Sequence, residues 1–131
     1  MEFAELYEQA KAVLNPRRVS EFVEVGGVGA AILTEGGHIY TGVCIDTACS
    51  MGFCAEHAAI AAMITAGEDK IAKVVAVNWD GIVMPPCGRC REFMSQLRPD
   101  WEKTQVMIAY NKVVPLNDLL PFHWNLSFVE S

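Results

Sequence analysis

The chain has 131 residues, of which 52% are hydrophobic and 20% charged, and its formal net charge is −6. A chain of this length can bury one core, so we expect a single domain over residues 1–131. The acidic balance argues against a nucleic-acid partner, which would need a basic surface. Neither a membrane-spanning run nor a signal-peptide pattern is seen, so we expect a cytoplasmic protein without membrane contact.

The hydrophobic content is high for a small domain. We therefore expect some apolar surface to be covered by further copies of the chain in a homo-oligomer. The cysteine count is five, an odd number that does not suit a disulfide framework. In a reducing compartment such cysteines more often bind metal or take part in catalysis.

The first half of the chain predicts a helix, a link and a β-hairpin. Residues 2–14 carry apolar side chains three and four apart, and the pattern ends before Pro16. Residues 17–25 indicate an irregular or partly extended link. Two runs, 28–34 and 38–45, flank a pair of glycines and predict the two strands of a hairpin.

The second half alternates helices with short apolar strands. The expected elements are a loop over 46–53, a helix over 54–64, a strand over 73–78, a helix over 87–97, strands over 106–110 and 113–114, and a helical turn over 116–120. This order predicts an α/β fold with three layers, α/β/α, around a mixed and mostly five-stranded sheet. The aromatic tail, 122–128, is expected to dock on the domain.

Two motifs carry the chemistry, Cys54-Ala55-Glu56 and Pro86-Cys87-Gly88-Arg89-Cys90. Each lies at a predicted helix start, and cysteines at i and i+3 share one helix face, so Cys87 and Cys90 can grip one ion together. Cys54 would be the third ligand. Helix N-termini favour the thiolate form. Zinc held by three protein ligands keeps a fourth position for water, as in a catalytic site.

Glu56 follows Cys54 by two residues, an offset that can turn its carboxylate toward the open position. There it can take a proton from water and return it as a general acid. Three thiolates on Zn²⁺ leave a net charge of −1, which weakens its pull on water. His57, Arg89 or Arg91 could offset this charge by contacting a sulfur, and the sequence does not choose among them.

Other interpretations stay open. The Cys-x-x-Cys pair could be a redox dithiol, although it lies late in the chain. A structural zinc site would need a fourth ligand, which Cys44, Cys49, His57 or His38 could supply. Cys44 and Cys49 also suit buried apolar positions. Glu56 could be no more than a partner of the helix dipole.

Taken together, the two motifs resemble the zinc-dependent cytidine deaminase family, in particular its small three-cysteine members. Residues 28–31, 37–42 and 116–121 are also similar to that family. The resemblance implies a cytidine-deaminase-like α/β/α fold, zinc on Cys54, Cys87 and Cys90, and Glu56 as proton shuttle. It implies hydrolytic removal of the exocyclic amine of a pyrimidine as ammonia. It also implies a homotetramer in which a neighbouring subunit completes each site.

The departures from the family pattern lie around the substrate. Where the family reads ribose with Asn-x-Glu, this chain has Cys44-Ile45-Asp46, and a thiol cannot replace the paired donor and acceptor of an amide. Gly26 stands where an aromatic residue is common, and His57 stands where arginine is common. Blasticidin S deaminase, a relative that acts on a cytosine-nucleoside antibiotic, also lacks the complete Asn-x-Glu motif. The candidate substrate-binding residues are Cys44, Asp46, Ala55, Pro86, Phe122 and Trp124.

We therefore expect a deaminase acting on a cytosine nucleoside, cytidine or deoxycytidine, or on a cytosine-nucleoside analogue. A blasticidin S deaminase-like resistance enzyme is one alternative. A zinc-stabilised module that binds a nucleoside without turning it over is the other, and a retained Glu56 argues against it. Deamination of nucleic acid is disfavoured by the net charge of −6.

Overall fold

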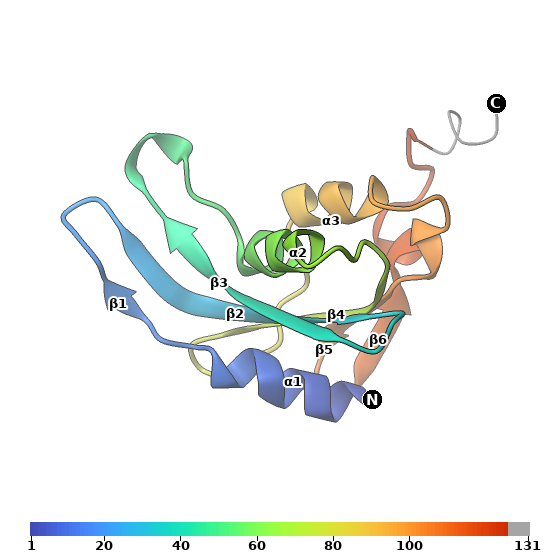
Figure 1. Ribbon diagram of the computed structural model, residues 1–131, viewed down its shortest axis with the longest axis horizontal. Coiled ribbons are helices and arrows are strands. Elements are labelled where there is room, and N and C mark those ends of the chain that lie inside the picture. Colours follow the sequence, from blue (N-terminus) through green and yellow to red (C-terminus); the bar gives the residue numbers. More distant parts are fainter. Residues whose placement is uncertain (126–131) are drawn as a thin grey trace.

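The computed structural model describes residues 1–125 and has helices on both faces of one mixed sheet (Figure 1). Its helices are α1 (Phe3–Ala12), α2 (Ala55–Thr65) and α3 (Gly88–Ser95). The strands are β1 (Arg17–Arg18), β2 (Glu24–Thr34), β3 (Ile39–Asp46), β4 (Ile71–Asn78), β5 (Gln105–Ala109) and β6 (Lys112–Pro115). Short 3₁₀ turns lie at Ala48–Ser50, Trp101–Lys103 and Leu116–Leu119.

The long strand β2 is the centre of the sheet. It pairs antiparallel with β3 and with β4, while β4 and β5 run parallel and β6 closes the far edge antiparallel to β5. The three-layer α/β/α prediction is thus confirmed, with one addition. Residues 17–25 were expected as an irregular or partly extended link, and the Val19 N–H donates to the Val23 carbonyl at 2.8 Å. This turn folds β1 back onto the start of β2 and gives the sheet a sixth strand.

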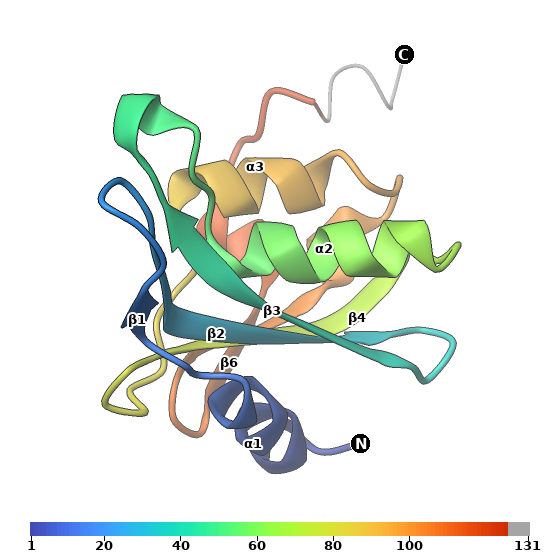
Figure 2. The same cartoon turned by 60° about the vertical axis from the view of Figure 1, so that its left-hand side comes forward.

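Strand alternation divides the core into two layers. On β2, Ala30 and Ile32 belong to the cluster under α2 and α3, whereas Ala31 and Leu33 belong to the cluster around α1. Figure 2 shows α1 on one face of the sheet and α2 and α3 together on the other. Because both faces are covered, the central strands are apolar at nearly every position.

Helix α2 lies unusually close to β3. A Cβ atom placed on Gly42 would lie 2.5 Å from the Ala58 Cβ and from the Ala59 nitrogen, so only glycine fits at this position. Just before the helix, Phe53 and Ile45 exchange two backbone hydrogen bonds of 2.9 and 3.0 Å. These contacts hold the N-terminus of α2, and hence Cys54, against the end of β3.

The expected docking of the aromatic tail is observed for residues 123–125, whereas Phe122 is fully exposed, and residues 126–128 lie outside the described part. Asn125 donates its side-chain N–H to the Ser95 carbonyl at 3.0 Å. His123 Nε2 lies 3.1 Å from Ser95 Oγ and 3.1 Å from a Glu92 carboxylate oxygen. The tail is therefore fastened to α3. Among the described helices, none is both long and apolar enough to span a membrane.

Candidate active site

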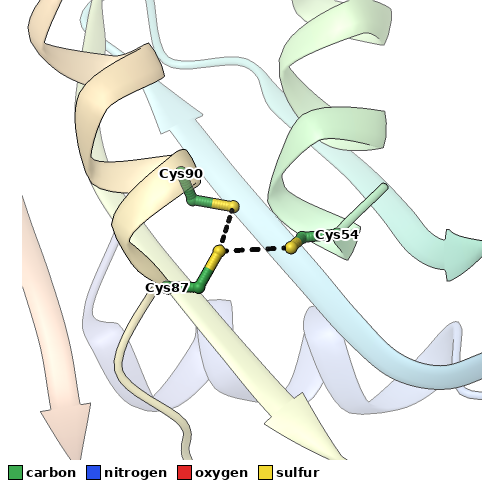
Figure 3. Close-up of side chains that lie close together, drawn as sticks. All are labelled: Cys54, Cys87 and Cys90. Atoms are coloured by element: carbon green, nitrogen blue, oxygen red, sulfur yellow. Dashed lines mark hydrogen bonds between the residues drawn. The ribbon is translucent and has the colours of Figure 1, made fainter. Parts of the chain in front are cut away.

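The three cysteines of the two motifs lie together at the starts of two helices. Cys54 is the N-cap of α2, Cys87 is the N-cap of α3, and Cys90 lies in the first turn of α3. Figure 3 shows their side chains pointing toward one another from the two helices. The Sγ atoms of Cys54 and Cys87 are 3.3 Å apart, and those of Cys87 and Cys90 are 3.6 Å apart.

The spacing of the sulfur atoms suits one zinc ion. Sulfurs that bind tetrahedral Zn²⁺ at about 2.3 Å lie roughly 3.8 Å from one another. Here all three sulfurs lie within 4.8 Å of one another, and within residues 1–125 no His, Asp, Glu or further Cys joins them as a fourth ligand. Cys44, Cys49, His38 and His57 are thus not part of the cluster. Three thiol ligands with one position left over match the layout of a catalytic zinc site.

As thiols, the three cysteines differ in acidity. Burial, followed by the hydrogen bond with Cys87, raises the pKa of Cys54 to about 11. Burial and then the charge of Glu56 raise the pKa of Cys90 well above its ordinary value. Burial also acts to raise the pKa of Cys87, but hydrogen bonds from the Cys90 N–H and from Cys54 outweigh it, and this pKa is lowered. A metal ion must therefore displace protons to bind.

Only one of the three candidate charge partners contacts a sulfur. The Nδ1 atom of His57 lies 3.3 Å from Cys90 Sγ, and the ring packs on Phe93 with the centroids 4.8 Å apart. Arg89 instead donates to the Gly52 carbonyl at 3.1 Å. Arg91 donates to the carbonyls of Pro86 and Leu119. Burial, followed by the charge of Arg89, lowers the pKa of His57 and favours its neutral form.

Glu56 lies in the first turn of α2 and is only 4% exposed. Burial raises the pKa of its carboxyl, while hydrogen bonds with its own N–H and with Cys90 act in the opposite direction. A buried carboxyl with a raised pKa binds a proton more readily than a solvated one and can release it again. Such a group suits proton transfer better than a role as a solvated partner of the helix dipole.

A cavity of about 400 Å³ opens above the cysteines and Glu56. Of the candidate substrate-binding residues, Cys44, Asp46 and Ala55 line it. The Cys44 Sγ atom accepts a hydrogen bond of 3.3 Å from the Val28 N–H, so part of its capacity is already used. Asp46 is exposed at the end of β3. Arg89 also lines the cavity, beside the cysteines.

Three other candidates lie elsewhere. Pro86 is buried, its carbonyl accepts the 2.7 Å bond from Arg91 Nε, and the neighbouring Pro85 lines the cavity. Phe122 and Trp124 are outside the cavity lining of their own chain. Phe122 is fully exposed at a positive φ of 56°, and the Trp124 indole N–H donates to Glu92 at 3.1 Å.

The cavity has one wall that sequence reasoning missed. Trp79 and Met84, from the loop after β4, line it together with Gly27 and Val28 of the neighbouring strand β2. Residues 79–84 were assigned only as a loop. The sequence did contain a signal for this wall, since Trp79 directly follows a predicted buried strand. Ligands of α/β sheets bind at the C-terminal ends of the strands.

The fold and the cysteine cluster together define a zinc-binding α/β/α protein. The family model described as "Cytidine and deoxycytidylate deaminase zinc-binding region" matches residues 5–112. The chain therefore belongs to the cytidine and deoxycytidylate deaminase zinc-binding family. Zinc is the metal of this family, and the three cysteines fit it.

Relatives and solved structures agree with this assignment. A cytidine deaminase from Halalkalibacterium halodurans is 35% identical over 98 residues, covering 72% of this chain and 74% of that protein. One from Mycobacterium tuberculosis is 34% identical over 68 residues, or 51% of each protein, so the aligned part spans about half of that relative.

In three dimensions, the crystal structure of cytidine deaminase from M. tuberculosis matches with a TM-score of 0.81 at 26% identity, covering 96% of this chain and 99% of that one. The structure from Burkholderia pseudomallei matches with a TM-score of 0.75 at 28% identity, covering 95% and 100%. These likenesses extend well beyond the metal motifs, so the walls of the cavity rest on the same framework.

Proposed function

We propose that the protein is a zinc-dependent hydrolase that replaces the exocyclic amine of a cytosine nucleoside with oxygen and releases ammonia. The observation that carries the proposal is a buried carboxyl, Glu56, beside a three-cysteine cluster at the floor of a cavity. The cavity volume of about 400 Å³ suits a ligand the size of a nucleoside. Cytidine and deoxycytidine are the first substrates to test.

The proposed step is a hydrolysis. Zinc bound by the three thiolates would supply an open coordination position and lower the pKa of water there toward ~7. Glu56 takes a proton from the attacking water as a C–O bond forms at the amine-bearing ring carbon. The same carboxyl then delivers a proton to the amine nitrogen as the C–N bond breaks and ammonia leaves. We propose that the Cys87 N–H, at the start of α3, helps to orient the water or the amine.

His57 is the proposed positioning residue for the metal ligands. Three thiolates would leave the zinc site with a net charge of −1. A hydrogen bond donated to one sulfur reduces the negative charge that this sulfur gives to the ion. His57 Nδ1 lies within 3.3 Å of Cys90 Sγ, whereas Arg89 and Arg91 bond to carbonyl oxygens. We assign the proton on His57 to Nδ1, because a sulfur ligand can only accept. The arginines then contribute at longer range.

The variant Glu56→Gln separates an enzyme from a binding module. Proton transfer by a placed side chain contributes about 10²–10⁴-fold to a rate. We expect the glutamine variant to lose at least that factor in turnover while zinc content and nucleoside binding persist. A module that only binds a nucleoside would show no turnover in either form and the same binding in both. Turnover of a zinc-loaded Gln variant at the wild-type rate would remove Glu56 from the mechanism.

The substrate itself depends on the wall that departs from the family pattern. Cys44 and Asp46 take the place of a neutral amide and a glutamate, so recognition of ribose is expected to be altered. A cytosine-nucleoside analogue such as blasticidin S is therefore the alternative substrate. The decisive assay is the loss of ultraviolet absorbance with cytidine, deoxycytidine and blasticidin S. If the zinc-loaded protein turns over none of these amines, the proposed activity is wrong.

The exposure of large apolar side chains supports assembly into a homo-oligomer, which we propose to be a tetramer. Phe22, Met51 and Phe122 are 66%, 74% and 100% exposed. Large exposed apolar side chains of this kind are typical of interfaces. Phe122 and Trp124, which lie outside their own chain's cavity, would then be available to stack on the base bound by a neighbour. Chromatography with light scattering tests the assembly, and a monomer would exclude this role.

Two broader proposals concern the chain as a whole. We propose that residues 1–131 fold as one domain, since β2 and its neighbours join the first and second halves in one sheet. We also propose a cytoplasmic setting, because all five cysteines are free and three of them are needed as thiolates.

A further inference from the structure

The outer half of the cavity is built by the C-terminal ends of β3 and β4 and by Gly27 and Val28 of the strand β2 between them. Val28 of β2 pairs with Asn78 of β4, and its N–H reaches Cys44 of β3. Asp46 ends β3, and Trp79 follows β4 directly. The amine of a substrate must lie at the floor, by Glu56 and the cysteines. The remainder of the substrate must therefore extend toward the wall that Asp46 and Trp79 form.

Trp79 is presented by a loop that is held in one conformation. The Asn78 side-chain oxygen accepts the N–H groups of Asp80 and Ile82 at 2.9 and 3.0 Å. The Met84 N–H donates to the Ala76 carbonyl at 2.9 Å, and the Tyr7 hydroxyl donates to the Gly81 carbonyl. A platform held in this way loses little conformational entropy when a ligand arrives.

The indole of Trp79 lines the cavity and is mostly exposed, so it contributes little to the core. It is 64% exposed, and its Cε3 atom lies 3.7 Å from a Cβ built on Gly27, so the ring lies over that glycine. The preceding Gly26 also carries no side chain; its φ is 81°, and a Cβ there would lie 2.2 Å from the Asn15 side-chain oxygen. Within residues 1–125 no hydrogen bond engages the Trp79 indole N–H. An exposed aromatic face of this kind binds planar groups and cations.

Asp46 adds negative charge to the same wall. It lies directly across the strand pair from Glu24, an arrangement of like charges that favours a nearby cation. Within the described part of the chain, no ion pair involves either carboxylate. Arg18, which pairs with Glu24 from β1, donates to the carbonyls of Ser20 and Glu21 instead.

Among the described residues, Arg89 is the one positively charged residue of the cavity lining, and its guanidinium donates to the Gly52 carbonyl. Gly52 lies against Asp46, since a Cβ built on it would be 3.2 Å from the Asp46 Cα. Within residues 1–125 Arg89 and Asp46 form no ion pair, so the outer wall has an aromatic face and a carboxylate without a direct cationic partner. In the part that the structure describes, the wall has no side-chain amide for sugar hydroxyls, and the Cys44 sulfur is already bonded to Val28.

We propose that Trp79 and Asp46 form an outer subsite that selects substrates carrying a positively charged group beyond the amino-heterocycle. The subsite disfavours phosphorylated substrates for the same reason. This inference rests on the proposed deaminase function, because that function puts the amine at the cavity floor. Cation–aromatic and exposed ion-pair contacts are each worth about threefold in affinity, or roughly tenfold together.

The probes are cytidine, 5′-amino-5′-deoxycytidine, which is cationic at neutral pH, and cytidine 5′-monophosphate. With zinc-loaded protein, we expect kcat/KM to be about tenfold higher for the amino compound than for cytidine, and lowest for the monophosphate. Asp46→Asn and Trp79→Ala should each reduce the preference for the amino compound by about threefold. Trp79→Phe should keep most of it. Ile82→Ala is the matched control, since Ile82 is 60% exposed on the same loop but does not line the cavity.

Binding to the Glu56→Gln variant, measured by calorimetry with the same probes, separates the two proposals. Turnover of all probes without a preference for the cation, or a preference that survives Asp46→Asn and Trp79→Ala, overturns the subsite. Selective binding of the amino compound without turnover by wild-type protein upholds the subsite and overturns the deaminase. Failure of every probe to bind or react overturns both.

Discussion

The most informative single change is His57→Phe. The ring of His57 packs on Phe93 and its Nδ1 atom lies 3.3 Å from Cys90 Sγ, so phenylalanine preserves the packing and removes the hydrogen bond. Loss of one partner that bonds to a metal ligand weakens metal binding by about 10–100-fold. This corresponds to about 1.4–2.7 kcal/mol. We expect the phenylalanine variant to bind zinc weaker by a factor in that range.

The assay is competition for zinc with a chromophoric chelator at fixed pH. Arg89→Gln and Arg91→Gln are the matched controls, because both guanidinium groups donate to carbonyl oxygens and not to sulfur. We expect them to change the zinc affinity by less than about threefold, as for other exposed charges. His57→Arg returns a donor to the same position and should recover part of the loss. Unchanged zinc affinity in His57→Phe, or a larger loss in Arg89→Gln, would refute the reasoning.

Three further predictions concern protons, backbone and tail. Zinc affinity should rise steeply with pH near 7, by up to about two powers of ten per pH unit. The reason is that the pKa values of Cys54 and Cys90 are raised, so both thiols must lose a proton to bind the ion. A flat profile in a chelator titration between pH 6 and 8 would contradict this. Gly26→Ala should destabilise the fold by about 1–3 kcal/mol, since a positive φ and the contact with Asn15 oppose a Cβ; urea unfolding measures the loss, and an unchanged midpoint would argue against it. Asn125→Ala should cost about 1–3 kcal/mol because the Ser95 carbonyl loses a buried donor; hydrogen exchange on α3 should then rise, and unaltered exchange would leave the tail without a structural role.

Glu56 should make the zinc-free protein less stable as the pH rises. A carboxylate that is stabilised in the folded state would have the opposite effect. The pKa of Glu56 is raised by burial, so below its unfolded pKa the group is neutral in both states and carries no penalty. As the pH rises above that value, the folded state must bury a charge and stability falls. For the zinc-free protein we therefore expect Glu56→Gln to be more stable than the parent at pH 8 and similar at pH 4. Thermal unfolding at both pH values measures this difference, and equal stabilities at pH 8 would contradict it.

The sequence was sufficient for half of the metal-binding end because that half is local. Cys87 and Cys90 share one helical turn, so their spacing predicted that they meet, whereas the assignment of Cys54 as the third ligand relied on the family resemblance. The order of helices and strands followed from periodicity in the same way. The sixth strand depends on the turn between Val19 and Val23, which brings Arg17–Arg18 back against β2, and no propensity of its own marks this pair of arginines as a strand.

The residues of the substrate wall could not be predicted from local spacing. The wall is assembled from residues of three strands. Which residue of the loop 79–84 reaches the cavity depends on the hydrogen bonds that this loop makes with Asn78 and Tyr7. Trp79 therefore went unnoticed, while Phe122 and Trp124 drew attention as aromatic residues near a terminus. The choice among His57, Arg89 and Arg91 likewise needed side-chain directions, which a pattern of charges does not contain.

The arrangement of the three sulfurs on two helices also bears on how the protein acquires its shape. Cys87 and Cys90 are separated by one turn, whereas Cys54 lies 33 residues before Cys87 in the chain. Closing that interval requires β4 to be inserted beside β2, because β4 connects the two helices. A metal ion captured early by the pair in α3 would be bound loosely and exchange freely. Only completion of the sheet delivers the third sulfur, so retention of the ion reports that the central strands have assembled in register.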